Sequence, residues 1–422
     1  MWLARLAGAV PGVYTCSVTA PPARIACLDL DTFFVSVERL FDPSLVGKPV
    51  VVGAVGNRGV VTSASYEVRP LGVRSGMSIV EARKLAPHAI YLPGRHDAYG
   101  PLAAKVKAVL ERYTPVVQTA SIDEFFLDFR GCEAYWRRAC DTDEDATIVR
   151  VNREMREAVF TETGLPASIG VGATRSIAKM ASGRAKPAGV CFAGSGAEPD
   201  FVADLPVRRF PGIGPVAEAA LVAGGVLTLG QLVRPTAATR GAFPGHVAAV
   251  AAAVFPTEAR DLGRDRPAFQ EHDPDGEARG TLSNERTFFD DLGDDAGIHA
   301  QLRALADRVA WRARKRGVKA RTVHLKLRYR DFETLTRSST GPPTDDPRVV
   351  LARCQTLFDA ARTRPLSIRL LGVGLSNLVG GGPQLGLPLG GRPSMGSAVD
   401  AVRARFGFDA IRLGATSSGA ER

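Results

Sequence analysis

Two short apolar segments that carry acidic residues constrain this chain more than any other feature. The first spans residues 25–30 and is interrupted by Asp29, and in the second Asp123 and Glu124 lead directly into an apolar run. Carboxylates are costly to remove from water unless a counter-charge accompanies them. If both segments are neighbouring strands, Asp29 faces Asp123 and Glu124. Three carboxylates at one point can hold two divalent ions, an arrangement that suits phosphoryl transfer.

The charge balance indicates a polyanionic partner. The chain has 422 residues, enough for two to four domains, and its 54 Lys and Arg against 44 Asp and Glu give a formal charge of +10. Much of this excess is local, because residues 301–330 hold eleven basic residues and a single acid, Asp307. The alternative interpretation of such a run is a solvated face.

Other classes of protein are disfavoured by the sequence. The six cysteines form no C-x-x-C pair, so a disulfide framework and a zinc site are not expected, and a reducing cytoplasm fits. No apolar run reaches the roughly 18 residues that a membrane span requires, so no membrane partner is expected. Residues 1–22 are mostly apolar with Pro11 inside; an N-terminal extension is favoured there over a signal peptide.

Patterning between residues 23 and 193 predicts a mixed α+β region. The order of strands and helices is β-α-β-β-α-β, which is typical of a ferredoxin-like sheet. Strands are expected at 23–31, 48–53, 59–66, 125–128 and 167–172, and helices at 35–40, 78–85, 99–113, 146–163 and 175–182.

The C-terminal region predicts a second α/β module with one basic face. It follows a linker at 264–280 rich in Asp, Pro and Gly. In the strand 323–330, Lys326, Arg328 and Arg330 alternate with apolar residues, so one face can follow a sugar-phosphate backbone. Further strands are expected at 281–289 and 368–378, and helices at 296–317, 347–363 and 398–406.

The turn Pro211-Gly-Ile-Gly214 lies between predicted short helices. The amides of Gly212 and Gly214 would stand at a helix N-terminus, where a DNA phosphate can bind. This segment resembles a helix-hairpin-helix.

These motifs together resemble the Y-family of translesion DNA polymerases, in its DNA polymerase IV (DinB) class. The resemblance covers about residues 23–378, and the order and spacing of its motifs make it specific. The motifs are Leu28-Asp-Leu-Asp-Thr-Phe-Phe34, Ala64-Ser-Tyr-Glu-Val-Arg69, Gly72-Val-Arg-Ser-Gly-Met77, Ser121-Ile-Asp-Glu124, Ala185-Lys-Pro187 and Pro211-Gly-Ile-Gly214.

The resemblance implies a right-hand polymerase with a ferredoxin-like palm, small fingers, a helical thumb with a helix-hairpin-helix, and an α/β little finger. The implied divisions are an extension at 1–22, palm at 23–32 and 99–193, fingers at 33–98, thumb at 194–263, linker at 264–280, little finger at 281–379, and a flexible tail at 380–422.

It also implies roles for individual residues. Asp29, Asp123 and Glu124 would be the catalytic metal ligands, with the Leu30 carbonyl assisting, for two Mg²⁺ ions that Mn²⁺ can replace. Asp31 is not expected to bind metal. Phe34 would be the steric gate that excludes a ribose 2′-hydroxyl. Val60, Thr62 and Gly76 would form the roof, that is, the small residues that cover the nascent base pair. The residues that would hold the incoming nucleotide are Phe33, Phe34, Ser63, Tyr66, Arg69 and Lys186.

The implied activity is primer extension on template DNA with deoxynucleoside triphosphates, at low fidelity and without a proofreading exonuclease. Gln384, Leu387 and Leu389 match a sliding-clamp motif in the tail, and a monomer is expected. Two alternatives remain. A two-metal nuclease would share the carboxylates but needs no triphosphate pocket, and an inert DNA-binding relative is expected to have lost the acids that this chain keeps.

Overall fold

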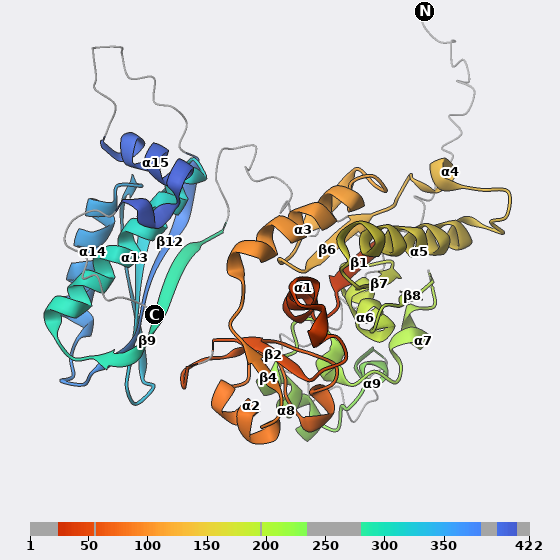
Figure 1. The fold of residues 1–422 in the computed structure, drawn as a ribbon, viewed down its shortest axis with the longest axis horizontal. Coiled ribbons are helices and arrows are strands. Elements are labelled where there is room, and N and C mark those ends of the chain that lie inside the picture. Colours follow the sequence, from red (N-terminus) through yellow and green to blue (C-terminus); the bar gives the residue numbers. More distant parts are fainter. Residues whose placement is uncertain (1–23, 55, 195, 234–279, 381–394, 412–422) are drawn as a thin grey trace, which may run out of the picture. The chain divides into compact units, whose positions relative to one another are not determined.

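The computed structural model describes residues 24–54, 56–194, 196–233, 280–380 and 395–411 (Figure 1). The chain divides into two compact units. The first unit consists of Met1–Gly53, Val61–Gly76 and Leu85–Asp265, and the second of Ala54–Val60, Met77–Lys84 and Arg266–Arg422.

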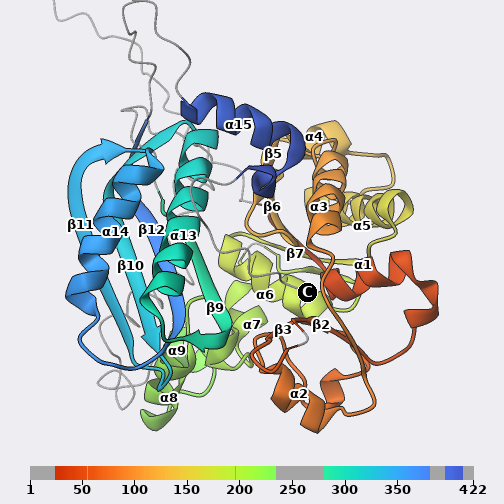
Figure 2. The same ribbon diagram turned by 60° about the vertical axis from the view of Figure 1, so that its left-hand side comes forward.

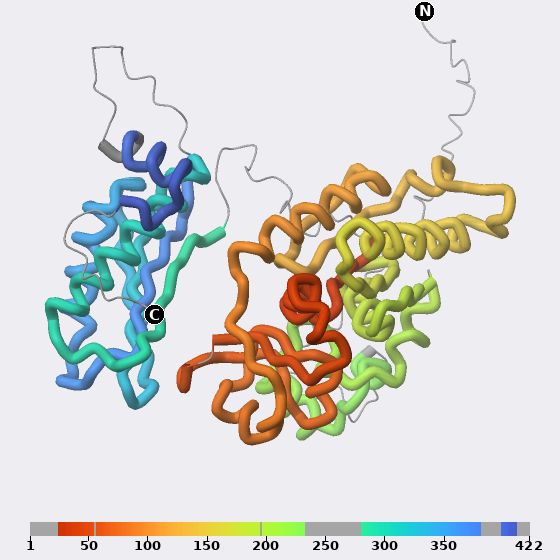
Figure 3. Tube along the Cα trace, viewed as in Figure 1, coloured from red at the N-terminus to blue at the C-terminus, as the bar shows by residue number. Residues whose placement is uncertain are grey.

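A five-stranded sheet, here called the central sheet, organises the first unit. Its strand order is β5-β6-β1-β7-β8, and neighbouring strands are antiparallel except for β7 and β8. The predicted acid-bearing segments are therefore adjacent strands, β1 and β6. Figure 3 shows the chain turning from β1 directly into helix α1 (Phe33–Phe41). The strands are β1 (Ile25–Leu30), β5 (Val116–Thr119), β6 (Glu124–Asp128), β7 (Ala167–Gly172) and β8 (Val190–Phe192).

The two faces of β1 pack against different helices. Leu28 and its alternating neighbours join a core that includes residues of α3 (His96–Leu110) and α5 (Glu144–Thr163). Cys27 instead packs with Ala178 of α6 (Arg175–Ala185) on the opposite face. Because side chains alternate along a strand, Asp29 lies on the α6 face.

Helix α6 lies unusually close to the central sheet, and Gly170 of β7 makes this possible. A Cβ atom at Gly170 would lie 1.9 Å from the backbone nitrogen of Ser182 and 2.2 Å from the carbonyl oxygen of Ala178. The missing side chain thus lets α6 rest its backbone on β7.

Smaller elements complete the first unit. A three-stranded sheet has the order β3-β2-β4, with β2 and β4 parallel. A separate apolar cluster holds together the short helices that follow β8, and Phe210 and Ile213 are buried in it. The elements are β2 (Val50–Gly53), β3 (Val61–Ala64), β4 (Ile90–Leu92), α4 (Glu133–Trp136), α7 (Glu198–Val202), α8 (Pro215–Ala223) and α9 (Leu229–Val233); α2 (Ile79–Leu85) belongs mainly to the second unit.

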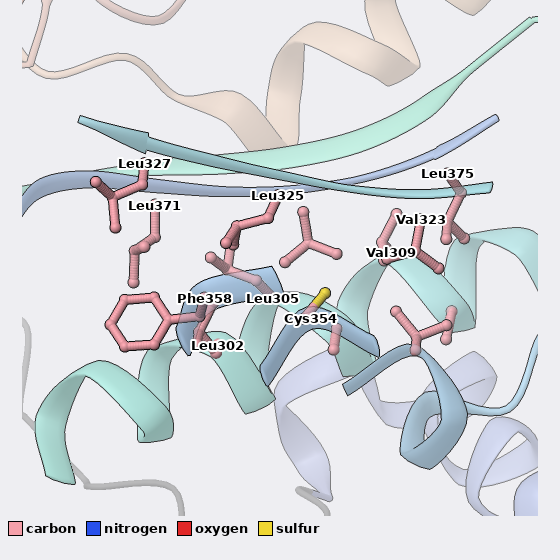
Figure 4. Close-up of a cluster of buried hydrophobic side chains, with 14 of the residues drawn as sticks. Leu302, Leu305, Val309, Val323, Leu325, Leu327, Cys354, Phe358, Leu371 and Leu375 are labelled. Atoms are coloured by element: carbon pink, nitrogen blue, oxygen red, sulfur yellow. The ribbon is translucent and has the colours of Figure 1, made fainter. Parts of the chain in front are cut away.

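The second unit contains a four-stranded antiparallel sheet, here called the C-terminal sheet, in the order β11-β10-β12-β9. Helices α13 and α14 cover one face of it (Figure 2). Leu305, Val323, Leu325 and Phe358 are among the buried side chains that fill the space between sheet and helices (Figure 4). The bounds are β9 (Leu282–Leu292), α13 (Asp295–Lys315), β10 (Val318–Tyr329), β11 (Thr334–Thr344), α14 (Pro347–Ala361) and β12 (Ile368–Gly380).

A last helix, α15 (Met395–Phe406), is attached to α13 by charged pairs. The guanidinium of Arg403 is fully buried and donates to both carboxylate oxygens of Asp307, at 2.9 and 2.6 Å. Arg314 pairs with Asp400 in the same way. Both pairs join α15 to α13.

Some predicted boundaries differ from the structure. The helix predicted at 99–113 is α3, His96–Leu110, and the last helix begins at Met395 rather than 398. Strands β4, β5, β8 and β11 were not predicted. Strand β11 is a largely exposed edge strand, so its sequence has no apolar alternation to reveal it.

Candidate active site

The antiparallel register of β1 and β6 brings the three predicted carboxylates to one end of the central sheet. Asp29 is the direct cross-strand partner of Glu124. The amide of Leu30 donates to the carbonyl oxygen of Asp123 at 2.9 Å, which places Asp123 at the same end of the strand pair. Directly opposed residues have Cβ atoms about 5 Å apart, so the carboxylates of Asp29 and Glu124 lie within a side chain's reach.

Each carboxylate at this site already has a polar partner. The ammonium group of Lys186 contacts Asp29 Oδ1 at 2.5 Å, and that of Lys179 donates to Glu124 Oε2. Asp123 accepts a hydrogen bond from the hydroxyl of Ser121. Burial raises the pKa of Asp29, and the nearby charges of Asp123 and Glu124 raise it further, whereas Lys186 acts in the opposite direction. The site therefore concentrates negative charge that cations must balance.

The donor set suits a hard divalent cation, although the present side-chain positions do not form a coordination sphere. Within the described ranges, no three carboxylate, imidazole or thiol groups converge closely enough to bind one ion. The carboxylates of Asp29 and Glu124 point to their lysines, and these ammonium groups stand where positive charge is needed. The backbone places oxygen ligands of the right kind together. An ion between them requires each carboxylate to separate from its lysine.

Asp31 is buried and has a different role from its neighbour Asp29. Its carboxylate accepts hydrogen bonds from the hydroxyl of Tyr66 at 2.9 Å, from Ser168 at 2.8 and 3.0 Å, and from the amide of Ala188 at 2.7 Å. Burial raises the pKa of Tyr66, and the charge of Asp31 adds to this effect. Asp31 thus ties β1 to β7 and to the segments that carry Tyr66 and Lys186.

The two phenylalanines after β1 lie in different environments. The ring of Phe33 is only 2% exposed and belongs to the core, so its side chain is not placed to contact a nucleotide. The ring of Phe34 is partly exposed and packs on that of Tyr99, with 4.3 Å between ring centroids. Only Phe34 of the pair can present its ring to a substrate.

The remaining predicted nucleotide contacts lie in the first unit with the carboxylates. Ser63 is buried at the end of β3, and the guanidinium of Arg69 lies over the ring of Tyr66, 4.4 Å from its centroid. Tyr66 and Lys186 are connected through Asp31, since Lys186 Nζ lies 3.9 Å from Asp31 Oδ1. Of the predicted roof residues, Val60, Thr62 and Gly76 are all exposed.

A groove of about 640 Å³ extends from Asp29 to the turn at Pro211. Asp29 and Lys179 line one part of it, and Pro211, Gly212 and Ile213 line another. Gly212 has a φ of 107°, a left-handed conformation that favours glycine, and α8 begins directly after Gly214. The predicted DNA-binding turn therefore lines the same groove as Asp29.

On the C-terminal sheet, the predicted basic residues face away from the core, but they are not all free. Lys326 pairs with Glu285 of β9 at 2.8 Å, and Arg328 donates to the hydroxyl of Thr334. Arg330 is exposed just beyond the end of β10. A trough of about 270 Å³ crosses this face over Gly372 and Gly374, two positions without side chains.

Several functional features were not predicted from the sequence. Lys179, Ser168 and Ala188 contact the acidic residues but belong to no quoted motif. Lys179 lies on α6, whereas Lys186 follows the end of that helix in an extended conformation, so helical spacing in the sequence does not connect the two lysines.

Some predictions concern residues that the structure does not describe. The proposed clamp-binding residues Gln384, Leu387 and Leu389 lie outside them, as do residues 1–22. Cys27, Cys132, Cys140, Cys191 and Cys354, the cysteines that the structure describes, are free thiols. Among the helices in the described ranges, none combines the length and hydropathy that a membrane span requires.

Three protein-family models match the chain. The impB/mucB/samB family matches residues 28–183, the C-terminal domain of that family matches residues 279–387, and the IMS family HHH motif matches residues 195–226. The last match covers the turn at Pro211-Gly212-Ile213-Gly214.

Curated relatives match over most of their length. The chain is 38% identical over 367 residues to a DNA polymerase IV of Streptomyces coelicolor, covering 85% of this chain and 71% of the relative. It is 33% identical over 411 residues to a DNA polymerase IV of Dehalococcoides mccartyi, covering 93% and 97%.

Solved structures share the fold at low sequence identity. A Y-family DNA polymerase chimera superposes with a TM-score of 0.68 at 21% identity, covering 85% of this chain and 99% of its own. DinB from Sulfolobus solfataricus gives a TM-score of 0.55 at 21% identity, with the same coverage. These likenesses confirm the predicted α+β right-hand fold class.

Proposed function

This chain belongs to the DNA polymerase IV (DinB) class of Y-family DNA polymerases, and we propose that it extends primers by two-metal phosphoryl transfer at Asp29, Asp123 and Glu124. It is a DNA-directed DNA polymerase with a translesion role, and it depends on divalent metal. The choice of residues, the number of ions and Mg²⁺ as the usual ion are parts of the proposal.

The observation that carries the proposal is the pairing of Asp29 with Glu124 across β1 and β6, with Asp123 alongside. Asp29, Asp123, Glu124 and the carbonyl of Leu30 would hold the ions. Bound there, Mg²⁺, or Mn²⁺ in its place, would lower the pKa of the primer 3′-hydroxyl and neutralise charge on the triphosphate. Because β1 and β6 are hydrogen-bonded to each other, the carboxylates would keep fixed positions. They would therefore help to align the primer 3′-hydroxyl with the triphosphate.

The chain's own cations and aromatic rings would position the nucleotide. Lys186 and Arg69 would bind the triphosphate oxygens, with the hydroxyls of Ser63 and Tyr66 as further donors. The partly exposed ring of Phe34, supported by Tyr99, would lie under the sugar and clash with a ribose 2′-hydroxyl. The backbone of Phe33 can still contribute an amide, although its ring cannot.

DNA would be held at two places. The amides of Gly212 and Gly214 would bind a backbone phosphate at the start of α8. Lys326, Arg328 and Arg330 would track the sugar-phosphate backbone from the C-terminal sheet without reading bases. We expect low fidelity, because the residues predicted to cover the nascent base pair, Val60, Thr62 and Gly76, are small and exposed and would constrain that pair little. The proposal also includes the absence of a proofreading exonuclease.

The decisive experiment compares primer extension by the wild type and by Asp123→Ala. Extension by the wild type should require Mg²⁺ and nucleotides and should fall by at least about 1,000-fold in the variant, because a metal ligand is lost. Glu157→Ala, which removes an exposed acid from α5, serves as the control and should extend normally. Cleavage of the primed template without nucleotides would instead favour a two-metal nuclease, and equal activity of Asp123→Ala would refute the assigned site.

The predicted clamp-binding role needs a separate test, because its residues lie outside the described ranges. Deleting residues 384–389 should lower the processivity seen with a sliding clamp and leave distributive synthesis unchanged. Loss of both activities to the same degree would contradict a clamp-binding role for Gln384, Leu387 and Leu389.

A further inference from the structure

Glu124, a proposed metal ligand, is held by a lysine that the nucleotide-binding scheme does not use. Lys179 reaches from α6 and donates from Nζ to Glu124 Oε2. The side chain of Glu124 is 12% exposed, whereas that of Lys179 is 46% exposed. The pair therefore joins a nearly buried acid to a cation that solvent still reaches.

This pair cannot persist unchanged when a divalent ion takes Glu124. An ammonium group and a divalent cation that share one carboxylate repel each other strongly, most of all at a partly buried site. The backbone of Glu124 is held in β6, in register with Asp29, and its side chain is nearly buried. Lys179 has a long and half-exposed side chain, so it is the partner that moves.

The groove beside Lys179 offers the displaced ammonium a new position. Lys179 lines this groove together with Arg184, Arg208 and Arg209, and Gly212 of the DNA-binding turn lines it too. Three acids, Asp29, Asp200 and Asp204, also line the groove, against four basic residues. The groove therefore reaches one of the proposed metal ligands, Asp29, and carries four cationic side chains that can contact the phosphates of a nucleic-acid strand.

We propose that Lys179 exchanges partners during the catalytic cycle: it holds Glu124 while the metal is absent, and it binds the primer-strand phosphate nearest the 3′ end once metal occupies Glu124. This inference rests on the proposed polymerase function and adds a primer-positioning residue to it. Because α6 rests directly on β7 at Gly170, the backbone of Lys179 stays fixed and only its side chain changes partner.

The exchange couples metal binding to primer binding. Without Lys179, metal no longer displaces an ammonium group, so Lys179→Met should bind Mg²⁺ or Mn²⁺ more tightly. The same variant lacks one phosphate contact, so it should bind primer–template more weakly, but only when metal is present. A purely structural lysine would produce neither of these opposite effects.

The first measurement is the shift in melting temperature that Mg²⁺ and, separately, Mn²⁺ produce in the protein without DNA. Lys179→Met should show a larger metal-induced shift than the wild type, while Lys105→Met, which removes an exposed lysine from α3, should match the wild type. An equal or smaller shift in Lys179→Met would overturn the proposal. If this variant is too unstable to purify, Lys179→Gln takes its place with the same expectation.

The second measurement is the fluorescence anisotropy of a labelled primer–template whose primer ends in a dideoxynucleotide, so that no extension occurs. With Mg²⁺, Lys179→Met should bind roughly 5-fold more weakly and lose about 0.9 from the salt slope of binding, as expected for one phosphate contact. In EDTA, its affinity should equal that of the wild type. Lys179→Arg should retain the Mg²⁺-dependent affinity.

These outcomes separate the inference from the proposed function. Unchanged DNA affinity of Lys179→Met in Mg²⁺, or an equal loss in Mg²⁺ and EDTA, refutes the exchange while a primer-extending wild type still supports the polymerase site. Failure of Asp123→Ala to reduce extension refutes the assigned site itself, whatever Lys179 does.

Discussion

Asp31 is a buried carboxylate that organises its surroundings without belonging to the proposed metal ligands. Its hydrogen bonds to Tyr66, Ser168 and Ala188 connect two strands and the segment after Lys186. A buried carboxylate that accepts from three donors stabilises the folded protein. If the carboxylate is removed, the three buried donors lose their acceptor, which costs free energy of folding. We therefore expect Asp31 to act on nucleotide binding through Tyr66 and Lys186.

Replacing Asp31 tests this positioning role. Asp31→Ala should lower the free energy of unfolding by about 2–4 kcal/mol, because it leaves buried donors unpaired, and Asp31→Asn should lower it less. Both should raise the KM for the nucleotide more than they reduce kcat. Urea unfolding and steady-state extension measure these effects, with Ser168→Ala as a control that should cost about 1 kcal/mol and leave KM unchanged. A normal KM in a folded Asp31→Asn protein would contradict the positioning role.

Phe34 is the other residue whose environment suggests a sharp test. Because its ring packs on Tyr99 and remains partly exposed, Phe34→Ala should open space beside the sugar. The ratio of kcat/KM for deoxyribonucleotides over ribonucleotides should then fall by roughly 10-fold or more. Phe33→Leu, a change in the core, should affect stability but leave this ratio intact. An unaltered ratio in Phe34→Ala would remove its assignment as a steric gate.

At the scale of elements, the contact between α6 and β7 positions both lysines of the site. Lys179 lies on α6 and Lys186 follows its end, while the backbone of α6 touches β7 where Gly170 has no side chain. Asp29 of β1 and Glu124 of β6 are direct cross-strand partners, so their side chains lie on the same face of the central sheet. The geometry of the charged cluster therefore depends on how closely this helix packs.

A pair of glycine substitutions measures that dependence. Gly170→Ala should destabilise the protein by about 1–3 kcal/mol or more, because its Cβ would overlap the backbone of α6. Gly183→Ala, inside α6 with open space around it, should instead stabilise by about 0.5–1 kcal/mol. Denaturant unfolding of both variants gives the comparison. If the two changes had the same sign, the close approach of α6 would not limit stability as proposed.

At the scale of the whole molecule, tertiary contacts redistribute the basic excess. The segment 301–330 is strongly basic along the chain, yet Arg314 pairs with Asp400, and Lys326 pairs with Glu285. The single acid of the segment, Asp307, is buried against Arg403. Part of this positive charge thus holds α15 and β9 in place, and less of it is available to DNA than the sequence suggested.

Because Lys326 is paired with Glu285, we predict that removing the charge of Glu285 strengthens DNA binding. Glu285→Gln should free the ammonium of Lys326 for a phosphate, so primer–template binding should strengthen and its salt slope should steepen by up to about 0.9. Asp359→Asn, the same change of charge on the exposed side of α14, serves as the control. Anisotropy titrations over a range of salt concentrations measure both. Weaker or unchanged binding by Glu285→Gln would argue against a DNA-tracking role for this face.

The sequence by itself determined which strands carry the acids, the α+β class and the family. These features were readable because they are local: an acid inside an apolar strand, a period of two along β10, and short motifs in a fixed order. Strand β11 and the exact start of α3 were not readable, because an exposed edge strand and a helix end carry weak local signals.

Only the tertiary structure decided which charges meet. Lys179 reaches Glu124, Ser168 reaches Asp31 and Arg403 reaches Asp307 across 55, 137 and 96 residues of sequence. Electrostatic energy depends on separation in space and on burial, neither of which is encoded in the spacing of residues along the chain. For this reason the acids and Lys186 could be predicted as site residues from the sequence, but the pairing of each acid with its cation could not.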